Sequence, residues 1–290
     1  MNNSMINASV SMAGLQQKLD ILGNNIANVN TVGYKRSDAT FQDLLRDTIN
    51  QPEGFARGGR LTPEGFNRGW SARVTGLQTI MEQGPMKETT KDTDLAIEGE
   101  GLFEVVVRGE DGAGNPTGVT AWTRNGNFQL TMQPGDPDNR YLATEEGHLV
   151  MGIVNGTEQP IRVPRDGKLM IDGDGRIRSE APDGTSTDLG RLKLVRMIRP
   201  QLLANAGDHL YMVPQELAGA GVEVVREIDL TDPTADKAGI QVRQRFLEQS
   251  NVDLANELTE MLTVQRAYQL SARMLSTSDT MMGLANNLRG

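Results

Sequence analysis

Two segments with an apolar repeat of about 3.5 residues, one at each end of the chain, constrain the fold more than any other feature. In the first, apolar side chains recur in alternating steps of three and four residues. Such a repeat places a narrow apolar stripe along one face of a helix, where a second helix can cover it. The stripe consists of Met5, Ala8, Met12, Leu15, Leu19, Leu22, Ile26 and Val29. Gly33, preceded by asparagines and a threonine, predicts the end of this helix.

The C-terminal segment repeats the pattern. Asn251 or Asp253 is suited to cap the start of this helix, and Glu257 is a favourable first-turn acid. A helix with so narrow a stripe gains little stability alone. Its partner is either the other terminal helix or a neighbouring chain, and periodicity leaves both open. The predicted stripe consists of Leu254, Leu258, Met261, Gln265, Tyr268, Ala272, Leu275 and Met282.

Between these helices the chain changes to short apolar runs broken by glycine, proline and aspartate, a pattern typical of strands. Asn125-Gly126 predicts a tight hairpin turn between two of the strands. A second short helix is predicted at 38–49, followed by a glycine-rich extended stretch at 54–69. Strands are predicted at 95–97, 102–107, 122–130, 141–154, 169–177 and 192–198.

The expected fold class is therefore α+β, with N- and C-terminal helices forming a coiled-coil-like domain and a β-rich central domain. Residues 1–30 and 251–290 form the terminal helical domain. Residues 31–90 and 214–250 are extended connectors, and residues 91–213 form the β-rich domain, a barrel or sandwich.

Composition excludes several classes of function. The net charge of −9 argues against a general grip on nucleic acid, which requires clustered basic residues. With no cysteine there is no disulfide framework, thiolate metal site or cysteine nucleophile. No apolar run is long enough for a membrane-spanning helix, and the N-terminus lacks the pattern of a cleaved secretory signal. We therefore expect no direct membrane insertion.

Local patterns that resemble catalytic or metal sites are incomplete. Residues 172–175, Asp-Gly-Asp-Gly, resemble part of a calcium loop, but the continuation lacks the further oxygen ligands and favours a hairpin turn. His148 and His209 have no neighbours at ligand spacing. We expect no catalytic residue, no metal, no cofactor and no enzymatic activity.

Specific motifs at both ends resemble the flagellar basal-body rod and hook proteins. Residues 23–36, GNNIANVNTVGYKR, are similar to the N-terminal signature of that family. Residues 94–103, 123–128 and 207–211 resemble parts of its β domain. The closing helix is matched by residues 247–253, 257–261, 265–268 and 276–279. The family-motif residues are Asn24, Asn25, Ala27, Asn28, Thr31, Gly33 and Tyr34.

The resemblance implies a structural subunit of the flagellar rod, of the distal-rod type by length. Such proteins are exported through the flagellar type III apparatus and reside in the basal body, in the periplasm or the cell-wall-spanning rod. Their partners are copies of themselves and other rod and hook proteins, and their terminal helices form a tubular drive shaft between motor and hook.

The predicted assembly interface follows from the helical stripes. The alternatives are a hook-type axial protein, a non-flagellar coiled-coil adaptor that forms a small defined oligomer, and a soluble hydrolase, for which no convergent polar pocket is evident. The interface residues are Met5, Met12, Leu15, Leu19, Leu22, Ile26, Leu254, Leu258, Met261, Tyr268 and Leu275.

Overall fold

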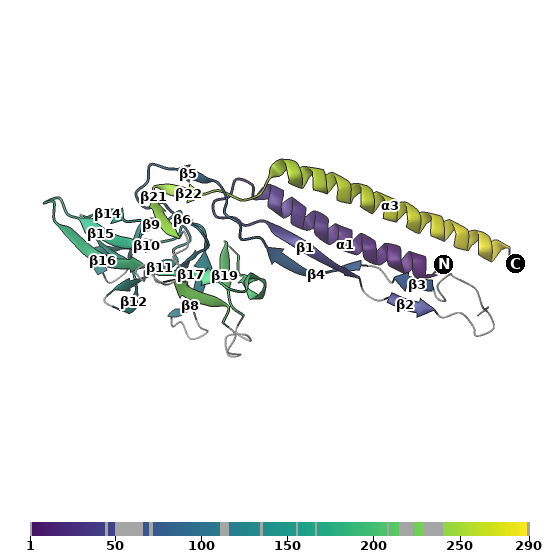
Figure 1. The fold of residues 1–290 in the computed structure, drawn as a ribbon, viewed down its shortest axis with the longest axis horizontal. Helices are drawn as coiled ribbons and strands as arrows, with labels where there is room; N and C mark the ends of the chain where they lie inside the picture. The colour runs from purple at the N-terminus through teal and green to yellow at the C-terminus, as the bar shows by residue number, and fades with distance from the viewer. Residues whose placement is uncertain are drawn as a thin grey trace, which may run out of the picture. The chain divides into compact units, whose positions relative to one another are not determined.

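The computed structural model describes residues 2–43, 46–49, 66–69, 72–110, 116–133, 136–154, 156–165, 167–207, 209–214, 223–228 and 240–288. The chain divides into two compact units (Figure 1). We call them the helical unit (Met1–Ala27, Ser37–Gln78 and Asp253–Gly290) and the β body (Asn28–Arg36 and Thr79–Val252). Terminal helices and a β-rich middle confirm the α+β class.

Two long helices lie side by side in the helical unit: α1 (Asn2–Ala27) and α3 (Leu254–Asn287) (Figure 1). They run antiparallel, because Lys18 of α1 forms an ion pair with Glu260 whereas Asn25, further along α1, bonds the earlier residue Glu257. The Oδ1 of Asp253 accepts from the backbone N–H of Ala255 at 2.9 Å, so Asp253 caps α3.

The strands described in the helical unit form two antiparallel pairs. Strand β1 (Ser37–Asp43) pairs with β4 (Ala72–Thr79), and β2 (Arg46–Ile49) pairs with β3 (Phe66–Gly69). The helix predicted at 38–49 is therefore wrong. Ala39 is buried and Thr40 exposed, and the Thr40 hydroxyl donates to the carbonyl of Gly76 in β4 at 3.1 Å. Pairing with a distant strand overrides the local preference.

Of the glycine-rich stretch predicted at 54–69, only β3 belongs to the described residues, and the rest lies outside them. Among the residues that the structure describes, no helix combines the length and the apolar character needed to cross a membrane.

The β body contains, within its described residues, a branched sheet of 14 strands and two separate strand pairs, β21–β6 and β22–β5. One path through the sheet runs β14-β15-β16-β11-β7-β8-β19-β18. A short 3-10 helix spans Pro200–Leu202. The strands are β5 (Met86–Glu88), β6 (Leu95–Glu98), β7 (Leu102–Glu110), β8 (Pro116–Thr123), β9 (Gln129–Gln133), β10 (Asp136–Ala143), β11 (Leu149–Val154), β12 (Thr157–Pro160), β13 (Arg162–Pro164), β14 (Lys168–Ile171), β15 (Arg176–Glu180), β16 (Ser186–Leu192), β17 (Leu194–Met197), β18 (Ala204–Asn205), β19 (Leu210–Met212), β20 (Val225–Ile228), β21 (Gln241–Gln244) and β22 (Phe246–Glu248).

Among the described residues of the body, one large apolar core and a second, small cluster of Tyr141, Ala143 and Leu149 are buried. Phe103 of β7 and Phe128 are fully buried, and their rings meet edge to face at 5.1 Å between centroids. The hairpin predicted at 172–175 is confirmed: Ile171 pairs with Ile177, and Gly175, with a φ of 72°, donates its N–H to the Asp172 carbonyl.

The hairpin predicted at Asn125-Gly126 is wrong. Strands β8 and β9 flank this dipeptide but do not pair with each other; β8 pairs with β7 and β19, and β9 pairs with β10. Gly126 instead packs against the backbone of Leu95, whose N–H donates to the Gly126 carbonyl at 3.0 Å. A Cβ on Gly126 would lie 1.7 Å from the Leu95 carbonyl oxygen, so the glycine is required by close approach of two backbone segments.

Replacing Gly126 with alanine is therefore expected to destabilise the body by about 3 kcal/mol, because two backbone segments must separate. Gly147→Ala is the matched control: Gly147 has a φ of 91° but nothing within 4 Å of the added Cβ. It should cost only about 1 kcal/mol in backbone strain. Urea unfolding of the full chain, followed by tryptophan fluorescence, compares the two, and equal losses would contradict the close-approach explanation.

Candidate assembly surface and buried ion cluster

The last turn of α1 is joined to α3 and β1 by a single buried side chain, that of Asn25. Its Oδ1 accepts from the backbone N–H of Ser37 at 3.0 Å, and its Nδ2 donates to the Ser37 carbonyl at 2.9 Å. The same Nδ2 also donates to Oε2 of Glu257 at 3.1 Å. Asn25 has no exposed surface and Glu257 only 1%. The amide thus bonds Ser37 as a neighbouring strand would, while it stabilises a buried carboxylate in the first turn of α3.

The family-motif residues that follow α1 belong to the β body and form a turn. Thr31 donates its backbone N–H to the carbonyl of Asn28 at 3.1 Å and its hydroxyl to the Asn28 side chain at 3.2 Å. The helix has already ended at Ala27, so Gly33 is not its stop residue. Gly33 has a φ of 71°, and a Cβ there would lie 2.6 Å from the backbone nitrogen of Asn125.

Two further motif residues, Asn24 and Ala27, lie on the exposed side of α1. Tyr34 is buried and meets the ring of His209 edge to face at 5.8 Å. This contact gives one of the two histidines a packing role.

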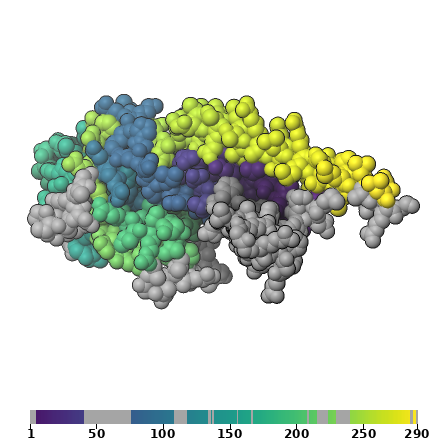
Figure 2. Space-filling model, turned by 45° about the vertical axis from the view of Figure 1, so that its right-hand side comes forward, coloured from purple at the N-terminus to yellow at the C-terminus, as the bar shows by residue number. Residues whose placement is uncertain are grey.

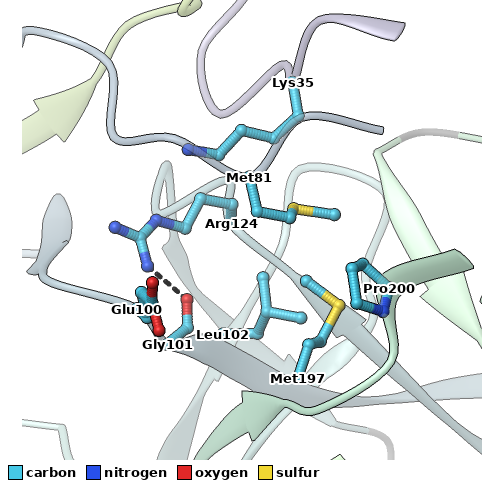
Figure 3. A pocket seen from close by; sticks show the side chains of 8 residues that line it. All are labelled: Lys35, Met81, Glu100, Gly101, Leu102, Arg124, Met197 and Pro200. Atoms are coloured by element: carbon cyan, nitrogen blue, oxygen red, sulfur yellow. Dashed lines mark hydrogen bonds between the residues drawn. The ribbon is translucent and has the colours of Figure 1, made fainter. Parts of the chain in front are cut away.

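A buried ion cluster lies beside this turn, centred on Glu248 at the end of β22. Its Oε1 accepts from Lys35 Nζ and from the backbone N–H of Gly84, both at 2.7 Å, and its Oε2 accepts from Arg124 Nε. The side chains of Lys35, Glu248 and Arg124 are 2%, 1% and 4% exposed. Arg124 also donates to the carbonyls of three residues that precede β7, namely Ile97, Gly99 and Gly101. Figure 3 shows the bond to Gly101.

The cluster holds two cations and one carboxylate. Burial lowers the pKa of Lys35, and the nearby Arg124 lowers it further, while Glu248 opposes both effects. Lys35 also donates to the carbonyl of Glu82 at 2.6 Å. Backbone carbonyl dipoles therefore share with Glu248 the task of stabilising the two buried charges.

Three segments that are distant in sequence meet around Glu248: residues 33–36, 80–85 and 248–251, which we call the collar. The N–H of Gly33 donates to the Glu248 carbonyl at 2.8 Å, and that of Ile80 donates to the Arg36 carbonyl at 2.8 Å. Asn251 accepts from the N–H of Arg36 at 2.7 Å and donates to the carbonyl of Ile80 at 2.9 Å. All of these bonds lie within the β body, so the collar belongs to the body's own fold.

The predicted interface residues all lie on the two helices, and the structure separates them into two sets. Those on α1 are buried or half-buried, and three of those on α3 are half-buried as well. We call these nine residues the inner set. It consists of Met5, Met12, Leu15, Leu19, Leu22, Ile26, Met261, Tyr268 and Leu275.

The other two predicted residues, Leu254 and Leu258, lie on the exposed side of α3. The buried positions of α3 include Glu257 and Val264, which are 1% and 6% exposed. The predicted stripe therefore mixed two faces of the helix, because it placed Leu258 where the buried face has Glu257, one residue earlier. Whether either face contacts other subunits stays a prediction.

The exposed side of α3 carries an apolar row of its own, which we call the outer stripe. Its members follow one another at steps of three, four, seven or eight residues, so neighbours in the row lie within about 80° of one another around the helix. The row as a whole turns by about 200° between Leu254 and Met274. Leu262 and Leu270 are 57% and 64% exposed. The outer stripe consists of Leu254, Leu258, Leu262, Leu270, Met274, Met281, Leu284 and, just after the helix, Leu288.

Lys35, Arg124 and Glu248 lie within the motifs that resemble the family, but the sequence predicted no role for them. Lys35 and Glu248 are 213 positions apart in the sequence. In the sequence, these three are charged residues within otherwise apolar or turn-forming motifs. This feature does not predict which of the charged side chains contact one another.

Replacing Asn25 with alanine is expected to destabilise the helical unit by about 2–3 kcal/mol, because the buried Glu257 carboxylate and the backbone of Ser37 lose a hydrogen-bond partner. Gln17→Ala, at an exposed position of the same helix, is the matched control and should change stability by less than about 0.5 kcal/mol. Far-UV circular dichroism during urea titration measures both. Equal effects of the two substitutions would contradict the role of Asn25.

The ion cluster predicts an asymmetry between its members. Glu248→Gln leaves two buried cations without a carboxylate and should cost about 3–5 kcal/mol. Lys35→Met leaves a neutral Arg124–Glu248 pair and should cost clearly less. Glu88→Gln, at an exposed position of β5, is the control for the loss of a surface carboxylate. Urea unfolding of the full-length variants tests this order, and a larger loss for Lys35→Met would contradict it.

Comparisons with known proteins agree with the motifs at both ends. The family described as "Flagella basal body rod protein" matches residues 7–35, and "Flagellar basal body rod FlgEFG protein C-terminal" matches residues 243–288. The second range contains Glu248 and all of α3, and the first contains Asn25 and Lys35.

Several relatives that match along the whole chain carry the same name, and the "Flagellar hook-basal body complex protein FlhP" of Bacillus subtilis also matches along the whole chain, at 28% identity. The "Flagellar basal-body rod protein FlgG" of Borreliella burgdorferi is 32% identical over 290 residues, covering 100% of this chain and 99% of its own length. The protein of that name in Bacillus subtilis is 32% identical, covering 100% of both chains, and that in Caulobacter vibrioides is 32% identical, covering 97% of both. Identity at this level along the full length shows the relationship: the chain belongs to the flagellar basal-body rod protein family and is similar to FlgG.

Proposed function

We propose that this chain is a structural subunit of the distal flagellar rod, which joins copies of itself and other rod and hook proteins through its terminal helices. The subunits form the tubular drive shaft between motor and hook. The role is mechanical and requires no catalysis. The family relationship supports the rod assignment, and the surface of α3 supports the mode of assembly.

The observation that carries the proposal is the outer stripe. Large apolar side chains scattered singly on a surface need no explanation, but a series of eight exposed leucine and methionine side chains along and just after one long helix favours an interaction surface. Figure 2 shows the atoms of α3, coloured from lime to yellow, at the surface along the helix. A neighbouring helix would remove this row from water, and the hydrophobic effect would favour that contact.

The inner faces of α1 and α3 are proposed to pair as a short antiparallel coiled coil. Alternating three- and four-residue steps along α1, together with burial of Ala8 and Leu22, support this pairing. Each subunit would then present a helical pair whose outer stripe is available to neighbours. Export through the flagellar type III apparatus and location in the basal body are further parts of the proposal, and they rest on the family relationship.

Substitutions in the outer stripe test this function. In the double variant Leu262→Asp and Leu270→Asp, both changed side chains are exposed in the single chain. Helix content and unfolding midpoint should therefore change little, whereas assembly should be lost because each buried carboxylate would cost several kcal/mol. The matched control, Leu262→Met and Leu270→Met, keeps the row apolar and should assemble normally.

Incorporation into hook–basal bodies and swimming motility measure assembly, and circular dichroism measures the fold. Normal incorporation of the aspartate variant would overturn the proposed interface. A coiled-coil adaptor would instead form a small defined oligomer, so a closed dimer or trimer by analytical ultracentrifugation, with no open-ended assembly, would favour that alternative.

A further inference from the structure

A cavity of about 140 Å³ lies in the β body next to the ion cluster. Figure 3 shows the cationic groups of Lys35 and Arg124 on one side of it and apolar or sulfur-containing side chains on the other. The apolar side is formed by Met81, Leu102, Met197 and Pro200. The volume is close to that of an engineered cavity of about 150 Å³ that admits benzene, so a small organic group would fit.

The charge around this cavity is unbalanced. Among the buried groups, Lys35 and Arg124 contribute two positive charges and Glu248 one negative charge, which leaves an excess of one positive charge. The exposed carboxylate of Glu82 also acts on Lys35, as a smaller effect than that of Glu248. Burying an unpaired charge is costly unless an anion or several hydrogen bonds compensate. The lowered pKa of Lys35 is consistent with incomplete compensation.

The two cations also retain donor capacity. An ammonium group has three N–H donors, and the described residues supply Lys35 with two acceptors, the Glu82 carbonyl and Glu248 Oε1. A guanidinium group has five N–H donors. The described residues supply Arg124 with four acceptors: the Glu248 carboxylate and the three backbone carbonyls that precede β7. Within the described part of the chain, each cation therefore has one donor left for a further acceptor.

Glu100 also lines the cavity, but its side chain is 82% exposed. Its Oε2 forms an ion pair with Nε of Arg196, at 3.9 Å. Glu100 is therefore not the carboxylate that balances the buried charge.

We propose that this cavity binds a carboxylate carried on a short apolar stem, with the carboxylate at Lys35 and Arg124 and the stem between Met81 and Met197. The methionine side chains are flexible and polarizable, which suits them to close around a stem of variable shape. Such a group comes either from a free short-chain carboxylate or from an acidic side chain of a second copy of this chain.

Butyrate is the probe for the first test. Full-length protein with isotope-labelled methionine methyl groups is titrated with butyrate, and the signals of Met81 and Met197 are followed by NMR. Saturable shifts are expected with butyrate, while butanol and butylammonium, which share the stem but lack the carboxylate, should cause none. Equal shifts with all three compounds, or none with butyrate, would overturn the proposal.

A pair of lysine variants tests the role of charge. Lys35→Met should weaken butyrate binding about tenfold or more, because it removes one charge-assisted hydrogen bond and the excess charge. Lys87→Met, at an exposed position of β5, is the matched control and should bind butyrate as the unchanged protein does. Unchanged affinity in a folded Lys35→Met protein would overturn the proposal; should that variant fail to fold, the comparison of the three compounds decides alone.

The source of the carboxylate is distinguished by an assembly measurement. Butyrate that binds the cavity and slows open-ended assembly would identify an acidic side chain of a second copy as the occupant. Butyrate that binds without changing assembly would identify a free carboxylate. The binding result does not depend on the proposed rod function, so the two proposals can fail separately.

Discussion

The buried carboxylate of Glu248 is the interaction on which the collar of the β body depends. It accepts from Lys35, Gly84 and Arg124, and these three residues come from different parts of the chain. A carboxylate removed from water is tolerated only when charged donors surround it, so its burial requires all three segments to be in place. The Glu248 side chain therefore joins its own segment to the other two segments of the collar, and Arg124 extends the constraint to the carbonyls that precede β7.

Side-chain amides provide a second means of joining segments without regular strand pairing. Asn25 bonds both backbone groups of Ser37, and Asn251 bonds the N–H of Arg36 and the carbonyl of Ile80. An amide offers one acceptor and two donors, so it can satisfy the free backbone groups at an edge where no further strand is present. Both amides belong to segments that resemble the rod-protein family, one near each end of the chain.

The sequence was most informative where structure is set by local periodicity. The repeat from Met5 to Ile26 predicted α1, and Asp253 was one of two expected caps of α3. Predictions failed where contacts between segments distant in the sequence determine the structure. In the range 38–49 the described residues form strands β1 and β2, because these segments pair with β4 and β3 further along the chain. Gly126 is required by the backbone of a distant strand and not by a hairpin. The meeting of Lys35 with Glu248 follows from neither propensity nor spacing, because it depends on the completed fold.

The two faces of α3 differ in how far their apolar side chains are buried, and this difference bears on when the helix is stable. The apolar side chains of the inner face, such as Val264 and Tyr268, are already buried or half-buried, whereas the leucine and methionine side chains of the outer stripe are exposed. Hydrophobic stabilisation scales with the apolar area removed from water. Most of the apolar area that α3 can still bury is therefore on the outer stripe, so contact with α1 alone leaves this stabilisation unrealised. A neighbouring subunit that covered the outer stripe would supply this hydrophobic stabilisation. The helix α3 would then be more stable in an assembly than in the single chain.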